Sequence, residues 1–295
     1  MPDAPMPSTP DSGAKFVTLN ADDYGLSEGI DRGILELVER GRLHAVSCMS
    51  LMAGWPTAAR ALRGLPSGVS VGLHLTLTAL PAGAALTSPS TTVDPGPGGL
   101  LARALGGPLD LATIKARIVD QLARVEDAVG RPPAHVDGHQ HVHAMPGIAG
   151  ILSAVLLARY GAALPWLRVT APALPAAPGA AVQRLVISGL GAHQRRLLQA
   201  TPFRSNAVFG GIRSFTERIS YAALLERQLI HAADEGTLIM CHPATAGRLA
   251  GDPVAAAREA EFSFLAGDGL DDALERAGCR LGPLSPLPIG PLRGR

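Results

Sequence analysis

Aspartate and histidine side chains that could hold a metal ion occur at four separated places in the chain. They are the adjacent pair Asp22 and Asp23, the single His74, a run with His139, His141 and His143, and His242 near the end. Two imidazoles and one carboxylate are three protein ligands that leave a coordination position open for water, as in a catalytic metal site. A second carboxylate beside such a site can act as general base on that water, so these residues predict metal-dependent hydrolysis.

Each of these residues, taken alone, has a purely structural explanation. Asp22 and Asp23 could cap the following helix, and a lone His74 could be a core side chain bonded to a carbonyl. The histidine-rich run could be a surface tract, and His242 could belong to a turn before Pro243. Two adjacent carboxylates, however, are costly to bury without a compensating cation. The combination therefore favours a metal site. The same donors could also hold Fe(II) in an oxygenase, a class whose sequences we expect to be mostly β.

Short apolar runs alternate with amphipathic helical patterns, and most candidate residues follow the runs. Strands are expected at 15–20, before a polar turn at 21–25, and at 44–51, 69–78, 167–170 and 237–240, with a short one leading into 135–143. Helices are expected at 56–63, 110–129, 182–199 and 221–235. This alternation predicts an α/β fold with a parallel sheet, and the length favours a TIM-like (β/α) barrel of six to eight regular strands. Such barrels carry their active sites at the carboxyl ends of the strands, where these residues fall.

The remaining segments set the limits of the domain. Residues 1–14 are expected to be a disordered tail, residues 15–284 a single barrel domain, and residues 285–295 a C-terminal tail. Residues 79–109 are rich in proline and glycine and lack periodicity, so we expect a long loop that is either a functional lid or a disordered insertion and that could shape the substrate cleft.

Composition and charge exclude several classes of protein. The chain has 26 basic and 25 acidic residues, so nucleic acid is not an expected partner. No apolar run is long enough to span a membrane. The three cysteines are far apart and form no CxxC pair, which indicates reduced thiols and a cytoplasmic location.

Four motifs along the chain carry a resemblance to a known family. They are Asn20-Ala21-Asp22-Asp23-Tyr24-Gly25-Leu26-Ser27, Val71-Gly72-Leu73-His74-Leu75, His135-Val136-Asp137-Gly138-His139-Gln140-His141-Val142-His143 and Cys241-His242-Pro243. In this order they resemble the YdjC-like carbohydrate deacetylases, which include chito-oligosaccharide and hopanoid-associated deacetylases. The later segment Arg258-Glu259-Ala260-Glu261 is also similar to the family. The resemblance implies a TIM-like barrel that removes acetyl groups from N-acetylated sugars with a divalent metal ion.

The resemblance also implies a role for each candidate residue. Asp22 is expected to be the general base, and His242 the acid or oxyanion stabiliser. The expected metal ligands are Asp23, His74 and His139, and His141 and His143 would line the site or orient ligands. Tyr24 is a further expected site-lining residue because it follows a predicted strand. If the histidine-rich segment is extended, His141 and His143 could approach the metal beside His139. Two departures from the family pattern are Gly138, where serine is expected, and Ala244, where glycine is expected.

The expected function is metal-dependent hydrolysis of the N-acetyl group of an acetylated carbohydrate to acetate and a free amine. The substrate would be a chito-oligosaccharide or the head group of a glycolipid, and Tyr24 and Trp166 could meet a sugar ring. The alternative is a catalytically inactive carbohydrate-binding or regulatory protein on the same scaffold. The donor set suits Zn²⁺, whereas the resemblance favours Mg²⁺, and both stay open. The apolar helices would allow a homodimer.

Overall fold

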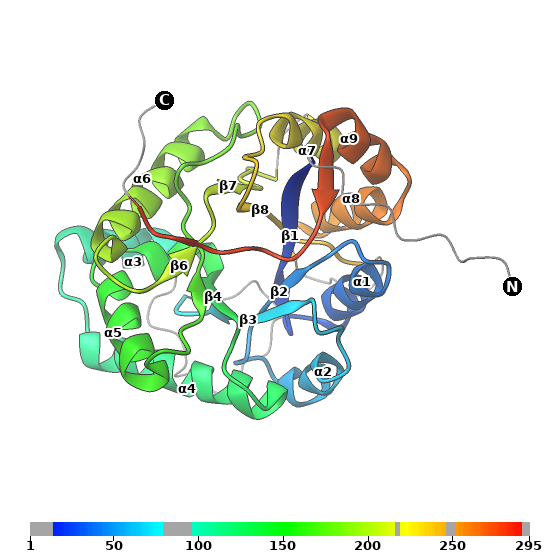
Figure 1. The fold of residues 1–295 in the computed structure, drawn as a ribbon. Coiled ribbons are helices and arrows are strands. Elements are labelled where there is room, and N and C mark those ends of the chain that lie inside the picture. The colour runs from blue at the N-terminus through cyan, green and yellow to red at the C-terminus, as the bar shows by residue number, and fades with distance from the viewer. Residues whose placement is uncertain (1–13, 79–95, 216–218, 246–251, 291–295) are drawn as a thin grey trace, which may run out of the picture.

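The computed structural model describes residues 14–78, 96–215, 219–245 and 252–290. Its strands form the centre of the molecule and its helices surround them (Figure 1). The predicted N-terminal tail lies almost wholly outside the described residues, as do residues 79–95 of the predicted long loop and the last five residues of the chain.

Parallel strands form most of the sheet, in the order β6-β5-β4-β3-β2-β1-β8-β7. They are β1 (Lys15–Tyr24), β2 (Ala45–Cys48), β3 (Ser70–Leu75), β4 (His135–Gly138), β5 (Trp166–Leu167), β6 (Arg204–Ser205), β7 (Val208–Gly210) and β8 (Thr237–Cys241). The strand β9 (Cys279–Leu281) pairs with the start of β1, and β10 (Leu287–Pro288) is antiparallel to β6.

The curled sheet is closed by the segment that follows β5. Ala173 forms an isolated parallel bridge with Phe209 of β7. The amide of Leu174 donates to the Phe209 carbonyl at 2.7 Å, and the Phe209 amide donates to the Pro172 carbonyl at 3.0 Å. This connection joins the β5 side of the sheet to β7. The predicted TIM-like (β/α) barrel is therefore confirmed, although β5, β6 and β7 are only two or three residues long.

Helices follow most of the strands and cover the outside of the barrel. They are α1 (Glu28–Glu39), α2 (Trp55–Leu62), α3 (Pro97–Gly106), α4 (Leu111–Val129), α5 (Ile148–Tyr160), α6 (Ala181–Leu198), α7 (Tyr221–Ile230), α8 (Ala255–Ala266) and α9 (Gly269–Ala277), with the 3₁₀ helix η2 (His139–Ala144) after β4. The helix α4 shows why such segments form. Asp110 accepts a bond from the Thr113 amide at its start, Gly130 ends it in the left-handed conformation, and its buried apolar residues recur at helical spacing.

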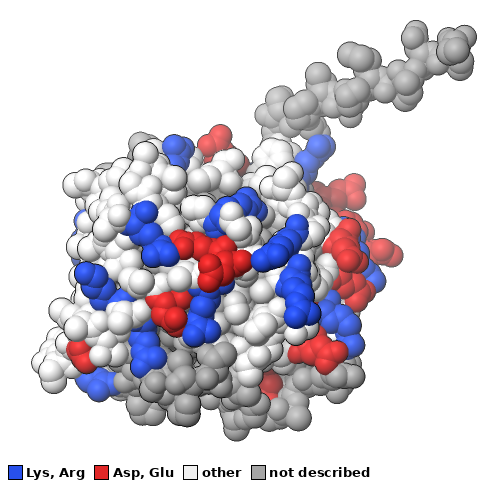
Figure 2. All heavy atoms as spheres, turned by 90° about the horizontal axis from the view of Figure 1, so that it is seen from below, with Lys and Arg blue, Asp and Glu red and all other residues white. Residues whose placement is uncertain are grey.

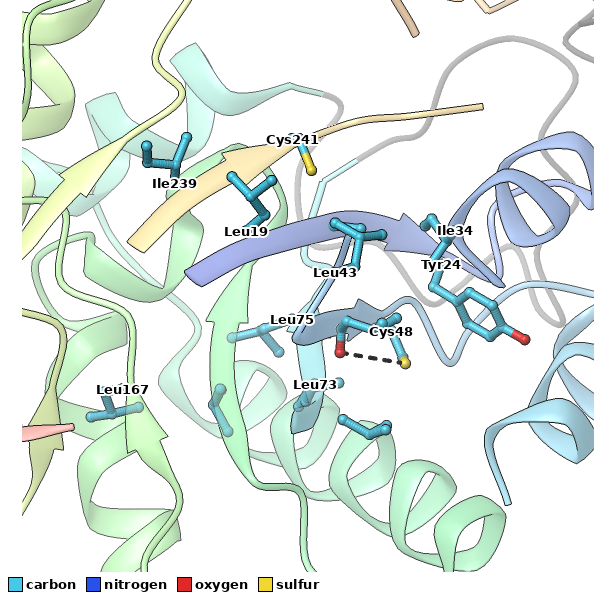
Figure 3. Packing of buried hydrophobic residues seen from close by; sticks show 14 of the residues in the cluster. Leu19, Tyr24, Ile34, Leu43, Cys48, Leu73, Leu75, Leu167, Ile239 and Cys241 are labelled. Carbon is cyan, nitrogen blue, oxygen red and sulfur yellow. Dashed lines mark hydrogen bonds between the residues drawn. The ribbon is translucent and has the colours of Figure 1, made fainter. Parts of the chain in front are cut away.

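The two faces of the strands bury different kinds of side chain. Leu19, Leu73 and Leu75 belong to the apolar core that the helices share with the strands, and Figure 3 shows these side chains packed around β1 and β3. The residues that alternate with them, such as His74, are polar although they too are buried. Because successive side chains of a strand point to opposite faces, the barrel interior receives the polar set. The predicted alternation at 69–78 is thus confirmed for β3.

Three segments differ from the sequence-based expectation. The strand β1 continues to Tyr24, through the residues predicted as a polar turn. Part of the predicted loop at 79–109 forms the helix α3, which its alanines and leucines support despite its glycines. The predicted C-terminal tail begins with β10, so its described part is paired with the sheet.

Substitution of Gly72 tests how tightly the barrel interior is packed. A Cβ atom at this position would lie 2.3 Å from the His135 ring. We expect Gly72→Ala to lower the free energy of unfolding by about 1–3 kcal/mol because of overpacking. Gly150→Ala on α5 is the matched control, since its Cβ would meet nothing within 4 Å. Urea denaturation of both variants measures the difference, and equal stabilities would contradict the close packing at Gly72.

Candidate active site

The predicted catalytic and metal-binding residues line one cavity at the carboxyl ends of the strands. Asp22 and Asp23 lie in β1, His74 lies in β3, His139 begins η2, and His242 follows β8. The cavity has a volume of about 540 Å³. The fold therefore brings together five side chains that are up to 220 positions apart in the sequence.

An irregularity in β1 turns Asp23 toward the imidazoles. The pairing of β1 with β2 shifts register between Ala21 and Tyr24, and Asp23 has a left-handed φ of 69°. Such bulges redirect side chains, and a left-handed aspartate is strained unless its surroundings hold it. Asp23 Oδ1 lies 3.2 Å from His139 Nδ1 and 3.5 Å from His74 Nε2. The bulge therefore places one carboxylate oxygen between two ring nitrogens.

Arg258 of α8 holds the other oxygen of Asp23. Its Nη2 donates to Asp23 Oδ2 at 2.7 Å, and its Nε donates to Asp252 at 2.7 Å. Burial by itself would raise the pKa of Asp23, but the charge of Arg258 and the hydrogen bond of His139 outweigh it and hold that pKa well below its usual range. Asp23 is thus an ionised carboxylate with Oδ1 directed at the two histidines.

His74 is oriented by a buried carboxylate behind it. Its Nδ1 lies 2.6 Å from Asp137 Oδ1, so Nε2 is the nitrogen that faces Asp23. Carboxylate support of this kind is the usual way in which a metal-binding imidazole is fixed in one tautomer and orientation. Burial opposes protonation of His74, yet the nearby charges of Asp137, Asp22 and Asp23 raise its pKa.

The donor atoms fit a divalent metal ion. Ligand atoms of Asp23, His74 and His139 all lie within 4.8 Å of one another. A second set, formed by Asp22, His74 and Asp137, meets the same limit. We favour the first set, because both aspartates of the second are ion-paired with the same guanidinium, whose positive charge would repel a bound ion.

Arg168, just after β5, is the guanidinium at the centre of this second set. It is fully buried, and it donates from Nη1 to Asp22 Oδ2 at 2.8 Å and from Nη2 to Asp22 Oδ1 at 2.6 Å. The same Nη2 lies 2.5 Å from Asp137 Oδ2. Burial opposes the charge of Arg168, but the two carboxylates raise its pKa further above the ordinary arginine value. One side chain thereby fixes both the predicted base and the carboxylate that orients His74.

The buried charges around the cavity do not cancel. Asp22, Asp23 and Asp137 are at most 2% exposed, and the guanidiniums that pair with them are those of Arg168 and Arg258. When the imidazoles are neutral, as metal ligands must be, three carboxylates against two guanidiniums leave one excess negative charge. A bound cation beside Asp23 would compensate it, which is a second reason why the residues fit a metal ion.

His242 lines the same cavity as the imidazole pair. Its Nε2 is 3.9 Å from Asp22 Oδ2, and its ring contacts Phe215 edge-on at 5.2 Å between centroids. The His242 amide donates to Glu261 Oε2 at 2.5 Å, which ties the segment after β8 to α8. Burial lowers the pKa of His242 although Asp23 and Asp22 oppose this shift.

A hydrogen-bonded network below Asp137 fixes the tautomer of His135. Ser47 Oγ donates its one hydrogen to Asp137 Oδ2 at 2.6 Å, so its 2.9 Å contact with His135 Nε2 requires a hydrogen on that nitrogen. Ser70 Oγ then donates to His135 Nδ1 at 2.9 Å. His135 is therefore neutral in the folded protein, and burial lowers its pKa to about 4.

Of the two histidines predicted to line the site, His141 lines the cavity and His143 does not. His141 has a left-handed φ of 59°. His143 is fully buried and its Nε2 donates to the Arg168 carbonyl at 3.1 Å, so it supports the backbone of Arg168. The segment is the 3₁₀ helix η2 and not the extended strand that would have brought both histidines beside His139.

The two aromatic residues expected to meet a sugar ring lie elsewhere. The Tyr24 hydroxyl donates to the Ala58 carbonyl at 2.7 Å, and its ring is fully buried against α2. Trp166 stacks on His135 with 4.4 Å between ring centroids. Both side chains fill the interior in this structure, which is the packing role that either residue could also have had from its position after a strand.

Several residues of the site had no predicted role, above all Arg168, Arg258 and Asp137. Asp137 stood inside a motif but received no role. A signal for Arg168 was present, because a lone arginine within the predicted strand 167–170 must find buried carboxylates. No sequence pattern pointed from Arg258 to Asp23, because they are 235 positions apart and meet only when α8 packs on the barrel.

The fold and this donor set define the class of the protein as a (β/α)-barrel hydrolase. The model of the YdjC-like protein family matches residues 16–276. The chain therefore belongs to the YdjC-like family, as its motifs predicted.

Relatives agree with this assignment, and a solved structure shares the fold. A chitooligosaccharide deacetylase of Serratia marcescens is 34% identical over 236 residues, which are 78% of this chain and 82% of the relative. One of Yersinia enterocolitica is 29% identical over 279 residues, or 92% of this chain and 98% of the relative. A solved protein of Enterococcus faecalis V583, to which cellobiose-phosphate cleavage is ascribed, has a similar fold, with a TM-score of 0.66 at 19% identity over 91% of this chain and 97% of that one.

Arg168→Met tests the buried ion network. Removing the guanidinium leaves Asp22 and Asp137 without their partner, so we expect the free energy of unfolding to fall by about 3–5 kcal/mol. Arg159→Met is the matched control, because Arg159 pairs with Glu126 on the surface, where an ion pair contributes about 0–1 kcal/mol. Urea denaturation measures both, and equal losses would show that Arg168 is no more important than a surface arginine.

The neutral state of His135 makes stability depend on pH. In the unfolded chain this imidazole binds a proton near pH 6.5, but in the folded protein only near pH 4. Between these values the unfolded chain binds more protons, so stability falls as the pH falls through this window. Urea denaturation across the window should give a smaller slope for His135→Asn than for the parent. The exposed control His193→Asn should keep the parent slope, and an unchanged slope in His135→Asn would contradict the assignment.

Proposed function

We propose that the protein is a metal-dependent carbohydrate N-deacetylase, which hydrolyses the N-acetyl group of an acetylated amino sugar to acetate and a free amine. The observation that carries the proposal is the buried pair in β1, where Asp23 faces two imidazoles and Asp22 stands beside it in the same cavity. The relatives from Serratia and Yersinia are chitooligosaccharide deacetylases, which supports the same reaction here. A cavity of about 540 Å³ is of the size that small-molecule sites usually have.

Asp23, His74 and His139 would hold one divalent ion. When bound, such an ion polarises the amide carbonyl and lowers the pKa of water, which are the two requirements of amide hydrolysis. Two nitrogens and one oxygen suit Zn²⁺, and Mg²⁺ is the alternative if water completes its coordination.

The remaining residues position and transfer protons. The fork of Arg168 and the amide of Asn20, whose Nδ2 donates to Asp22 Oδ1 at 2.8 Å, hold the Asp22 carboxylate in one orientation. Asp22 takes a proton from the attacking water. His242 is unprotonated before the reaction because burial lowers its pKa, and its Nε2 lies 3.9 Å from Asp22 Oδ2. This separation is longer than a hydrogen bond, so the proton passes from Asp22 to His242 through one bridging water, and His242 donates it to the departing amine.

The location that we propose is the cytoplasm. Cys48, Cys241 and Cys279 are all buried free thiols in the structure. Free thiols of this kind persist in a reducing compartment, whereas an oxidising one favours disulfides.

Two substitutions separate the base from a metal ligand. Asp22→Asn should lower kcat by at least about 100-fold, because the side chain keeps its shape but loses its basicity. Its bound metal, measured by atomic emission, should stay at one ion per chain. His74→Ala should lose both activity and metal, and the exposed His193→Ala should lose neither. Full activity of Asp22→Asn would remove Asp22 from the mechanism.

Acetate release from N-acetylglucosamine and its short oligomers tests the activity itself. We expect release from the parent protein, loss of release after EDTA treatment, and recovery with one added metal, which identifies the ion. The rival function is an inactive carbohydrate-binding protein on this scaffold. It would bind these sugars in calorimetry with a full complement of metal and release no acetate.

A further inference from the structure

The outward face of α6 carries apolar and basic side chains and no acidic ones. Its residues recur every three or four positions, as on one side of a helix. They are all exposed: Val182, Leu185, Val186, Gly189, His193, Arg196 and Leu197. We call this set the α6 face. Val182 and Leu185 are each 74% exposed, which is unusual for adjacent apolar side chains on one helix.

The α6 face is continuous with the wall of the cavity. Val182 and Val186 belong to the face and also line the cavity, together with Ile187 and Leu190 deeper in the same helix. The other apolar side of the cavity includes Leu101 of α3. A surface that covers the α6 face would therefore lie at the mouth of the candidate active site.

The segment that contains this face has basic residues and no acidic ones. Residues 138–216, which include α5 and α6, contain seven arginines and no lysine, aspartate or glutamate, although the chain as a whole is balanced. Three of these arginines, Arg159, Arg168 and Arg213, pair with carboxylates from other parts of the chain. Arg184 of α6 donates to the carbonyls of Ala173 and Leu174, and Arg204 donates to that of Pro286, so these contacts leave their positive charges uncompensated. In the view of Figure 2, by contrast, basic and acidic side chains lie side by side.

We propose that the α6 face is a docking surface for an anionic lipid bilayer, and that docking turns the mouth of the cavity toward the membrane. Exposed valine and leucine side chains beside arginines, without carboxylates, are the composition of helices that lie in the membrane interface. Anionic lipids complement the arginine excess. No helix in the described part of the chain is long and apolar enough to cross a bilayer, so the association is peripheral.

Two other occupants fit the α6 face less well. Nucleic acid would complement the arginines, but it gives no reason for the exposed Val182 and Leu185. A second copy of the chain would cover the apolar side chains. In a symmetric dimer the same patch meets itself, so Arg196 of both copies would be buried in an interface whose patch offers no acidic side chain.

Vesicle sedimentation of the full chain tests the proposal. We expect the protein to sediment with phosphatidylcholine vesicles that contain phosphatidylglycerol, and much less with phosphatidylcholine alone. The double variant Val182→Asp/Leu185→Asp should bind the anionic vesicles at least about tenfold less, because it loses two inserting side chains and adds negative charge. Ile230→Asp on α7 is the matched control, since Ile230 is also exposed, at 62%, but lies on a different helix. It should bind like the parent.

A third variant separates the electrostatic contribution. Arg196→Gln should reduce binding to the anionic vesicles about fivefold and leave binding to phosphatidylcholine unchanged. Sedimentation velocity without lipid, and a fluorescence titration with duplex DNA, examine the other occupants. The proposal would be overturned if the parent failed to bind anionic vesicles or if the double variant bound them equally well. It would also be overturned if the parent formed a dimer or a DNA complex that was lost in the double variant and kept in the control Ile230→Asp. The experiment needs no turnover, so its result is independent of the proposed deacetylase activity.

Discussion

The buried ion network around Arg168 is the constraint on which the rest of the site depends. Its guanidinium binds both oxygens of Asp22 and one of Asp137, and Asp137 in turn fixes the ring of His74. The predicted base and a predicted metal ligand are therefore oriented by a single side chain. Burying these charges is favourable only if every member keeps its partner, so the strands that carry them must be in register.

Backbone strain accompanies this network at the same end of the barrel. Asp23, Gln140 and His141 have positive φ values although none is a glycine. Residues in this conformation persist only when their surroundings hold them. Arg258 supplies that support at Asp23 from outside the barrel, and the 3₁₀ turn of η2 places His139 opposite it. The geometry of the donors is thus determined by local backbone irregularities and not by the regular strand pattern.

The cavity combines a polar floor with an apolar wall. The floor consists of the carboxylates and imidazoles at the strand ends, where water and a cation can enter. The wall comes from α3 and α6, whose apolar side chains Leu101, Val186 and Leu190 face the same space. On α6 this wall continues to the protein surface beside arginines. The polar floor with the candidate catalytic residues is therefore distinct from the apolar wall that α6 extends to the protein surface.

Local sequence patterns were sufficient to predict the barrel and most of the candidate donors. Apolar periodicity indicated the strands and helices, and the motifs around Asp22, His74, His139 and His242 placed the donors at strand ends, because both signals are local. These patterns did not reveal the helix α3 within 79–109 or the paired β10 in the supposed tail, where composition indicated loops.

The partners that compensate the buried charges could not be predicted in this way, because they meet only in the folded protein. Arg168 reaches Asp22 across 146 positions and Arg258 reaches Asp23 across 235, distances over which no local pattern carries information. The same is true of Tyr24 and Trp166, which became interior side chains. Which polar groups become partners depends on the closure of the barrel, since buried charges bind whichever opposite charge the fold brings within a few ångströms.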